Sequence, residues 1–60
     1  MRKLTYELSK NNKVIVSTTN KFIFANKVIN MVQKITGEKM SMDQATLYLV
    51  EEQGYDYIVD

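Results

Sequence analysis

The sequence predicts one small α+β domain spanning residues 1–60, with a single-layer sheet packed on two helices in the order ββαα(β). The apolar pattern repeats every two residues as far as about Thr18, and then every 3.6 residues, which indicates a hairpin followed by helices. The two glycines, Gly37 and Gly54, stand where those helices would stop. No internal repeat or Gly- or Pro-rich linker divides the chain.

The sheet begins with two strands. Leu4, Tyr6 and Leu8 alternate with polar residues, which is typical of a half-buried strand. Residues 14–18 are β-branched or small and suit a second strand. Together they predict an N-terminal β-hairpin.

The hairpin loop falls within residues 10–13, where two asparagines tolerate a positive φ. A two-residue loop, Asn11-Asn12, would leave Val14 and Val16 on the face away from the apolar residues of the first strand. A three-residue loop, 10–12 or 11–13, places all of them on one face. Burial of a single face therefore favours the three-residue loop.

The first helix is the element with the clearest periodicity. Residues 18–20 offer N-cap oxygens, the helix should run to about Thr36, and Gly37 fits the C′ position. Ile23 falls within the polar arc of the helical wheel. The apolar arc fills about half of the wheel; it consists of Phe22, Phe24, Ala25, Val28, Ile29, Met31, Val32 and Ile35.

The second helix is predicted by its ends. Ser41 and Gln44 have the spacing of a capping box, and Gly54 marks a stop after a helix of residues 42 to about 53. Leu47 should face away from the core. The expected core-facing residues are Met42, Ala45, Leu49 and one of Tyr48 or Val50. Residues 55–60 alternate again and predict a short third strand.

The residue types argue against enzymatic chemistry. The chain has no Cys and no His, so it lacks a disulfide, a thiolate metal site and the usual general base. Its serines have no histidine to activate them, and no glycine-rich loop could hold a phosphate. The spacing of the C-terminal carboxylates matches no cation-binding loop. We expect a non-enzymatic protein without cofactor or metal.

The chain also lacks the patterns that direct proteins to membranes. Residues 1–7 include basic residues but no apolar run behind them, and no stretch approaches the roughly 20 apolar residues of a membrane span. A cytoplasmic protein with no membrane partner is therefore expected. The composition, rich in Lys, Asn and Ile, is associated with low-GC bacteria and with their phages and other mobile elements.

Charge is distributed unevenly. Residues 1–40 carry all eight basic residues and a net charge of +6, whereas residues 41–60 carry −5 and no basic residue. Such asymmetry is typical of a nucleic-acid or acidic-partner surface in one half. The alternative is that the two halves attract one another within the fold.

A protein interface is suggested by apolar and aromatic residues beyond what one thin sheet needs to cover. The candidate residues are Ile23, Phe24, Met31, Leu47 and Tyr48. Tyrosines are enriched at interfaces, and small domains without a covalent or metal staple often oligomerise. We therefore expect a protein partner and a homodimer, with Phe24 and Met31 at or near the dimer contact.

A nucleic-acid contact is the second interpretation, because Lys and Asn bind phosphates and base edges and a β-ribbon can enter the major groove. The candidate residues are Lys10, Asn11, Asn12, Lys13, Lys27 and Lys34. A sequence pI near 8.0 is below that of dedicated nucleic-acid binders.

The leading functional hypothesis is therefore a small binding protein that inhibits or regulates a protein partner stoichiometrically. A nucleic-acid-binding regulator is the first alternative. The second is a nucleic-acid mimic that uses the acidic C-terminal third to block a basic groove.

Overall fold

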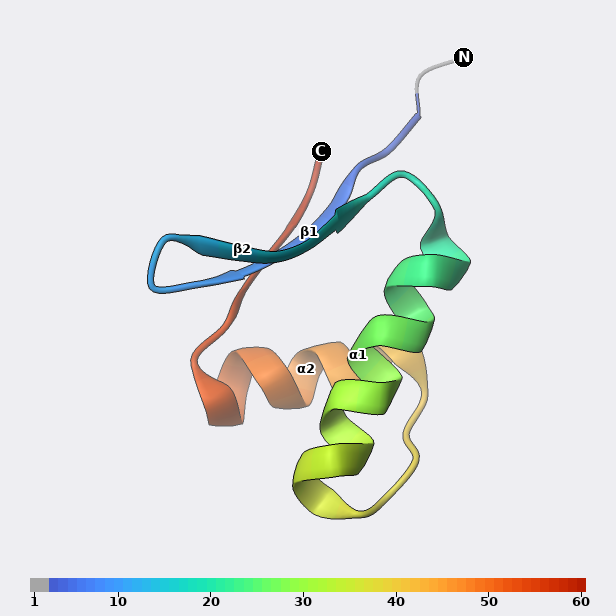
Figure 1. The fold of residues 1–60 in the computed structure, drawn as a ribbon, viewed down its shortest axis with the longest axis vertical. Helices are drawn as coiled ribbons and strands as arrows, with labels where there is room; N and C mark the ends of the chain where they lie inside the picture. The colour runs from blue at the N-terminus through green and yellow to red at the C-terminus, as the bar shows by residue number, and fades with distance from the viewer. Residues whose placement is uncertain (1–2) are drawn as a thin grey trace.

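The computed structural model describes residues 3–60, which form an α+β fold as the sequence predicts. The elements are β1 (Tyr6–Lys10), β2 (Lys13–Thr18), α1 (Lys21–Thr36), α2 (Met42–Gln53) and β3 (Asp56–Val59). The strands form one antiparallel sheet in the order β2-β1-β3. Both helices lie on the same side of this sheet (Figure 1). The Cα atoms span 37 × 24 × 14 Å, so the molecule is two layers thick at most.

The hairpin loop differs from the sequence expectation. Lys10 pairs with Lys13, so the loop has two residues, Asn11 and Asn12, and the expected three-residue loop is wrong. Both asparagines have positive φ, 54° and 64°. A two-residue hairpin loop with two positive φ values has a type I′ backbone, whose twist matches that of the strands.

A β-bulge resolves the conflict between this loop and the burial of one face. The pairing shifts between Leu8 and Ser9, so that Ser9 pairs with Val14 but Leu8 pairs with Val16. The additional residue in β2, Ile15, returns Val16 to the face of Leu8. Val14 remains on the opposite face and is exposed, contrary to the expectation.

The third strand pairs with β1 and not with β2. Tyr6 lies opposite Val59, and the pairing continues outwards through two hydrogen bonds between the backbones of Thr5 and Asp60, of 2.7 and 3.0 Å. Leu4, expected on the buried face of the first strand, precedes β1 and is half exposed.

Both helices begin and end where the sequence predicts. The side chain of Asn20 accepts hydrogen bonds from the backbone N–H groups of Phe22 and Ile23, which caps α1. Ser41 caps α2 through the N–H of Gln44 at 3.3 Å. Gly37 and Gly54 end the helices with left-handed φ values of 80° and 73°, as residues without a Cβ readily do.

The core is small and joins all layers. Its fully buried residues are Leu8, Phe24, Val28, Val32, Ala45 and Leu49. The Phe24 ring lies between two tyrosines, with ring centroids 5.7 Å from Tyr6 and 5.4 Å from Tyr57. The apolar arc of α1 is narrower than expected, because Phe22 is 79% exposed and Ile35 is also exposed.

Within residues 3–60, no helix has both the length and the apolar character that a membrane crossing requires.

Candidate functional site

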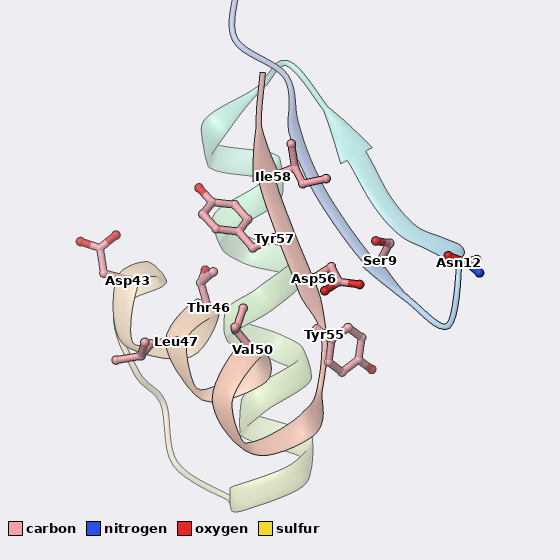
Figure 2. A pocket seen from close by; sticks show the side chains of 10 residues that line it. All are labelled: Ser9, Asn12, Asp43, Thr46, Leu47, Val50, Tyr55, Asp56, Tyr57 and Ile58. Carbon is pink, nitrogen blue, oxygen red and sulfur yellow. The ribbon is translucent and has the colours of Figure 1, made fainter.

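A hollow of the described surface lies between α2 and β3, and we refer to it as the α2–β3 groove. Its volume is about 740 Å³. One wall is formed by Asp43, Thr46, Leu47 and Val50 of α2, and the other by residues 55–58 at and before β3 (Figure 2). Ser9 and Asn12 extend the lining towards the hairpin.

The α2 wall is a regular helical stripe. Its four residues have the spacing i, i+3, i+4 and i+7, which places them on one face of the helix. This stripe lies beside the one that packs into the core, which includes Ala45 and Leu49. Leu47 is 55% exposed and Val50 is also exposed, so apolar surface in this stripe faces the groove.

The β3 wall is an edge strand, because β3 pairs with β1 on one side only within the described sheet. Thr5 and Asp60 exchange both backbone hydrogen bonds, so they are a hydrogen-bonded pair of the antiparallel ladder. Such pairs alternate with non-bonded ones along the ladder, and Ile58 is therefore bonded to β1. The N–H and C=O groups of Tyr57 and Val59 point the other way, to the free edge.

Thr46 supplies a polar group at the bottom of the groove. Its side chain points from α2 towards β3 (Figure 2). Only 6% of the residue is exposed, and its Oγ1 has no hydrogen-bond partner within residues 3–60. An unpaired buried hydroxyl costs about 1–3 kcal/mol, so this atom has a bonding capacity that the isolated fold does not use.

The electrostatic character of the groove is acidic. Asp43 and Asp56 contribute carboxylates, and none of the ten residues that line it is basic. Burial raises the pKa of the Tyr57 hydroxyl, and the nearby Tyr6 and Asp43 raise it further. Lys10, outside the lining, places its Nζ 5.0 Å from the centroid of the Tyr55 ring.

The predicted protein-interface residues are not brought together. Phe24 is fully buried and therefore presents no surface to a partner. Met31 is half-buried against the core, and Ile23 is exposed on α1. Tyr48 is half-buried, and its hydroxyl accepts a hydrogen bond from Gln53 Nε2 at 3.2 Å. Leu47 alone among the five lines the groove.

The predicted nucleic-acid residues form two separate groups. Residues 10–13 lie at the hairpin tip, which points away from α1 (Figure 1), where Lys27 and Lys34 are exposed. Positive φ values account for Asn11 and Asn12 without any ligand. Lys10 packs on the Tyr55 ring. No single basic surface collects all six residues.

The groove contains residues that the sequence analysis did not propose as functional. Thr46, Val50 and Ile58 come from two elements, and their proximity depends on which edge of the hairpin β3 joins. The one local signal was the i, i+3, i+4, i+7 stripe that starts at Asp43, which places Leu47 in line with exposed neighbours.

Within residues 3–60, no three acidic side chains lie close enough together to hold a metal ion. Neither a protein-family model, nor a curated protein, nor a solved structure matches this chain significantly.

Proposed function

We propose that this chain is a non-enzymatic binding protein that inhibits or regulates a protein partner by stoichiometric contact through the α2–β3 groove. The observation that carries the proposal is the combination of a free strand edge with an exposed apolar stripe opposite it. The groove offers backbone groups at the free edge of β3 and exposed apolar side chains on α2. Those are the contacts that proteins use to recognise one another.

The magnitude of the available contact fits a specific interaction. Leu47 is 55% exposed and Ile58 is 51% exposed, and Val50, which also lines the groove, is exposed as well. Complete burial of one exposed Leu, Ile or Val side chain contributes about 1.5–3 kcal/mol, and roughly half of that remains to be gained here. Interfaces commonly depend on a few well-packed residues at their centre.

Site-directed cross-linking in a lysate of the source organism tests this proposal. A photoreactive residue is placed at Leu47, and a matched one at Lys27, which is exposed on α1. We expect a discrete adduct of one chain with one partner from position 47 but not from position 27. An excess of the parent chain should compete with the adduct, whereas an excess of a Leu47→Lys chain should not. Identical adducts from both positions, or none from position 47, would contradict the proposal.

The nucleic-acid alternative rests on fewer residues than the sequence indicates, because the hairpin tip and α1 present their lysines separately. If Lys10 and Lys13 contact phosphates, affinity should fall with salt by roughly one log-slope unit per contact. Their replacement by Glu should then weaken binding to all sequences alike. Absence of binding to duplex and single strands at low salt would remove this alternative.

A further inference from the structure

Building on the proposed function, we propose that the groove receives an extended segment of the partner protein, with alternating basic and apolar residues, as a fourth strand on the free edge of β3. The inference concerns the class of partner segment and its mode of binding. It rests on the backbone of β3, on the side chains that flank it and on the charge of the groove.

Hydrogen-bonded and non-bonded pairs alternate along the ladder of β3 with β1. Tyr57 and Val59 each direct one N–H and one C=O to the free edge, which matches the spacing that an added strand would use. The backbone N–H of Tyr55 is already bonded to the carbonyl of Leu49 at 3.0 Å, so the available edge begins after it. Addition of a strand to such an edge is a recurrent way of recognising extended peptides.

The other edge of the sheet is less suited to the same role. The β-bulge at Ile15 interrupts the regular spacing of β2, and bulges of this kind protect edge strands from further pairing. No register shift interrupts the pairing of β3 with β1. The free edge of β3 is also the one that borders the groove, where side chains can add specificity.

The side chains specify an alternating segment. Successive residues of an added strand point to opposite faces of the sheet. Those on the helix side would meet Leu47 and Val50. Those on the other side would lie next to Asp56 and Ile58. Apolar residues towards α2 and basic residues towards Asp56 satisfy both faces.

Charge decides between a foreign segment and a second copy of this chain. Residues 41–60 carry a net charge of −5, and the exposed Asp56 lies on β3 at the free edge. Pairing of β3 with the β3 of a second copy would bring two copies of the same acidic segment together, and like charges destabilise cross-strand pairs. A basic segment turns the Asp56 carboxylate into a favourable contact, so the partner strand is basic.

NMR spectroscopy of the labelled full chain tests this inference with a defined probe, a short capped peptide that alternates lysine with valine. We expect the amide protons of Tyr57 and Val59 to exchange about tenfold more slowly with saturating peptide. Ile58 serves as an internal control, because its amide is already bonded to β1. A matched peptide that alternates glutamate with valine should have no effect.

A pair of substitutions at one position separates backbone pairing from side-chain contact. Val59→Pro removes an outward N–H without removing a bond to β1, and proline is tolerated at such edge positions. We expect it to weaken peptide binding about tenfold, equivalent to about 1.4 kcal/mol, whereas Val59→Thr should bind as the parent does. Retained protection of the Ile58 amide verifies that β3 still pairs in the proline variant.

The other possible results would overturn strand addition, and they can be told apart from one another. Shifts of the Leu47, Val50 and Ile58 methyl groups without protection of the Tyr57 and Val59 amides would mean that the groove binds its ligand in another form. The proposed function would then stand and the inference would fall. Shifts confined to β2, or equal effects of the acidic peptide, or no response at millimolar peptide, would also overturn the inference. The cross-linking experiment at Leu47 tests the proposed function independently of these NMR results.

Discussion

Two threonines in the helices show how the same side chain can serve opposite purposes. Thr36 Oγ1 donates a hydrogen bond to the carbonyl of Val32 at 2.9 Å and accepts one from the N–H of Glu38, which helps to end α1. Thr46 is buried, and its hydroxyl has no partner within residues 3–60. The first hydroxyl stabilises the fold, whereas the second costs free energy unless a partner uses it.

These two positions give a matched pair of substitutions. We expect Thr46→Val to raise the free energy of unfolding by about 1 kcal/mol, because it removes an unsatisfied buried hydroxyl while keeping the β-branched shape. Thr36→Val should lower it by about 0.5–1.5 kcal/mol, because a satisfied bond is lost. Urea unfolding followed by circular dichroism measures both. Equal losses at the two positions would show that Thr46 is bonded in solution.

Tyr57 connects the core to the groove. Its ring packs on Phe24, and its hydroxyl has a raised pKa, caused first by burial and then by Tyr6 and Asp43. A tyrosine with a higher pKa in the folded state favours folding fully below its ordinary pKa of about 10. This contribution is lost as the pH rises through the raised pKa of the folded state.

We therefore expect the free energy of unfolding to decrease above about pH 10. Tyr57→Phe should reduce the steepness of this decrease, and Asp43→Asn should reduce it in part, because it removes one of the three causes. Urea unfolding in a series of alkaline buffers measures the slope. The same slope in the parent and in Tyr57→Phe would place the responsible group elsewhere.

At the scale of the elements, what the sequence predicts well is what is encoded locally. The N-termini of both helices are set by short-range hydrogen bonds to the side chains of Asn20 and Ser41. These bonds depend only on residues within one turn. The hairpin loop differs from the prediction because two irregularities offset each other: the two-residue type I′ loop turns Val16 away from the face of Leu8, and the β-bulge turns it back. An alternating apolar pattern indicates on which face of the sheet each side chain lies, but not where a bulge inserts an additional residue.

The candidate site was less predictable, because it is assembled from elements whose pairing is not local. Leu47 was recognised as exposed from helical periodicity alone. The free edge that Leu47 faces exists only because β3 joins β1. That pairing directs the backbone N–H and C=O groups of Tyr57 and Val59 outwards. Phe24 was assigned to an interface because the helical wheel gives the width of the apolar arc but not which part of it the sheet covers.

At the scale of the whole molecule, the core is small relative to the surface. Domains have a stability of roughly 0.05–0.15 kcal/mol per residue, which is about 3–9 kcal/mol for a chain of 60 residues. Six fully buried apolar side chains carry most of it, with Phe24 the largest among them. One truncation at the centre of this core therefore removes a large share of the total.

Two phenylalanines on α1, separated by one residue, test how the molecule uses its apolar surface. We expect Phe24→Ala to lower the free energy of unfolding by about 3–5 kcal/mol, because removal of its fully buried ring leaves a cavity in the core. Phe22→Ala should change it by no more than about 0.5 kcal/mol in the monomer, because Phe22 is 79% exposed. Thermal melts at low and high protein concentration measure both.

The homodimer remains a prediction, with its contact moved from the buried Phe24 to exposed residues such as Phe22 and Ile23. It requires the melting temperature of the parent to rise with protein concentration. Phe22→Ala should abolish that rise, and sedimentation equilibrium should give the corresponding masses. A parent that sediments as a monomer at hundreds of micromolar would rule out the dimer, and a loss of stability on Phe22→Ala equal to that of Phe24→Ala would contradict the arrangement of α1 on the sheet.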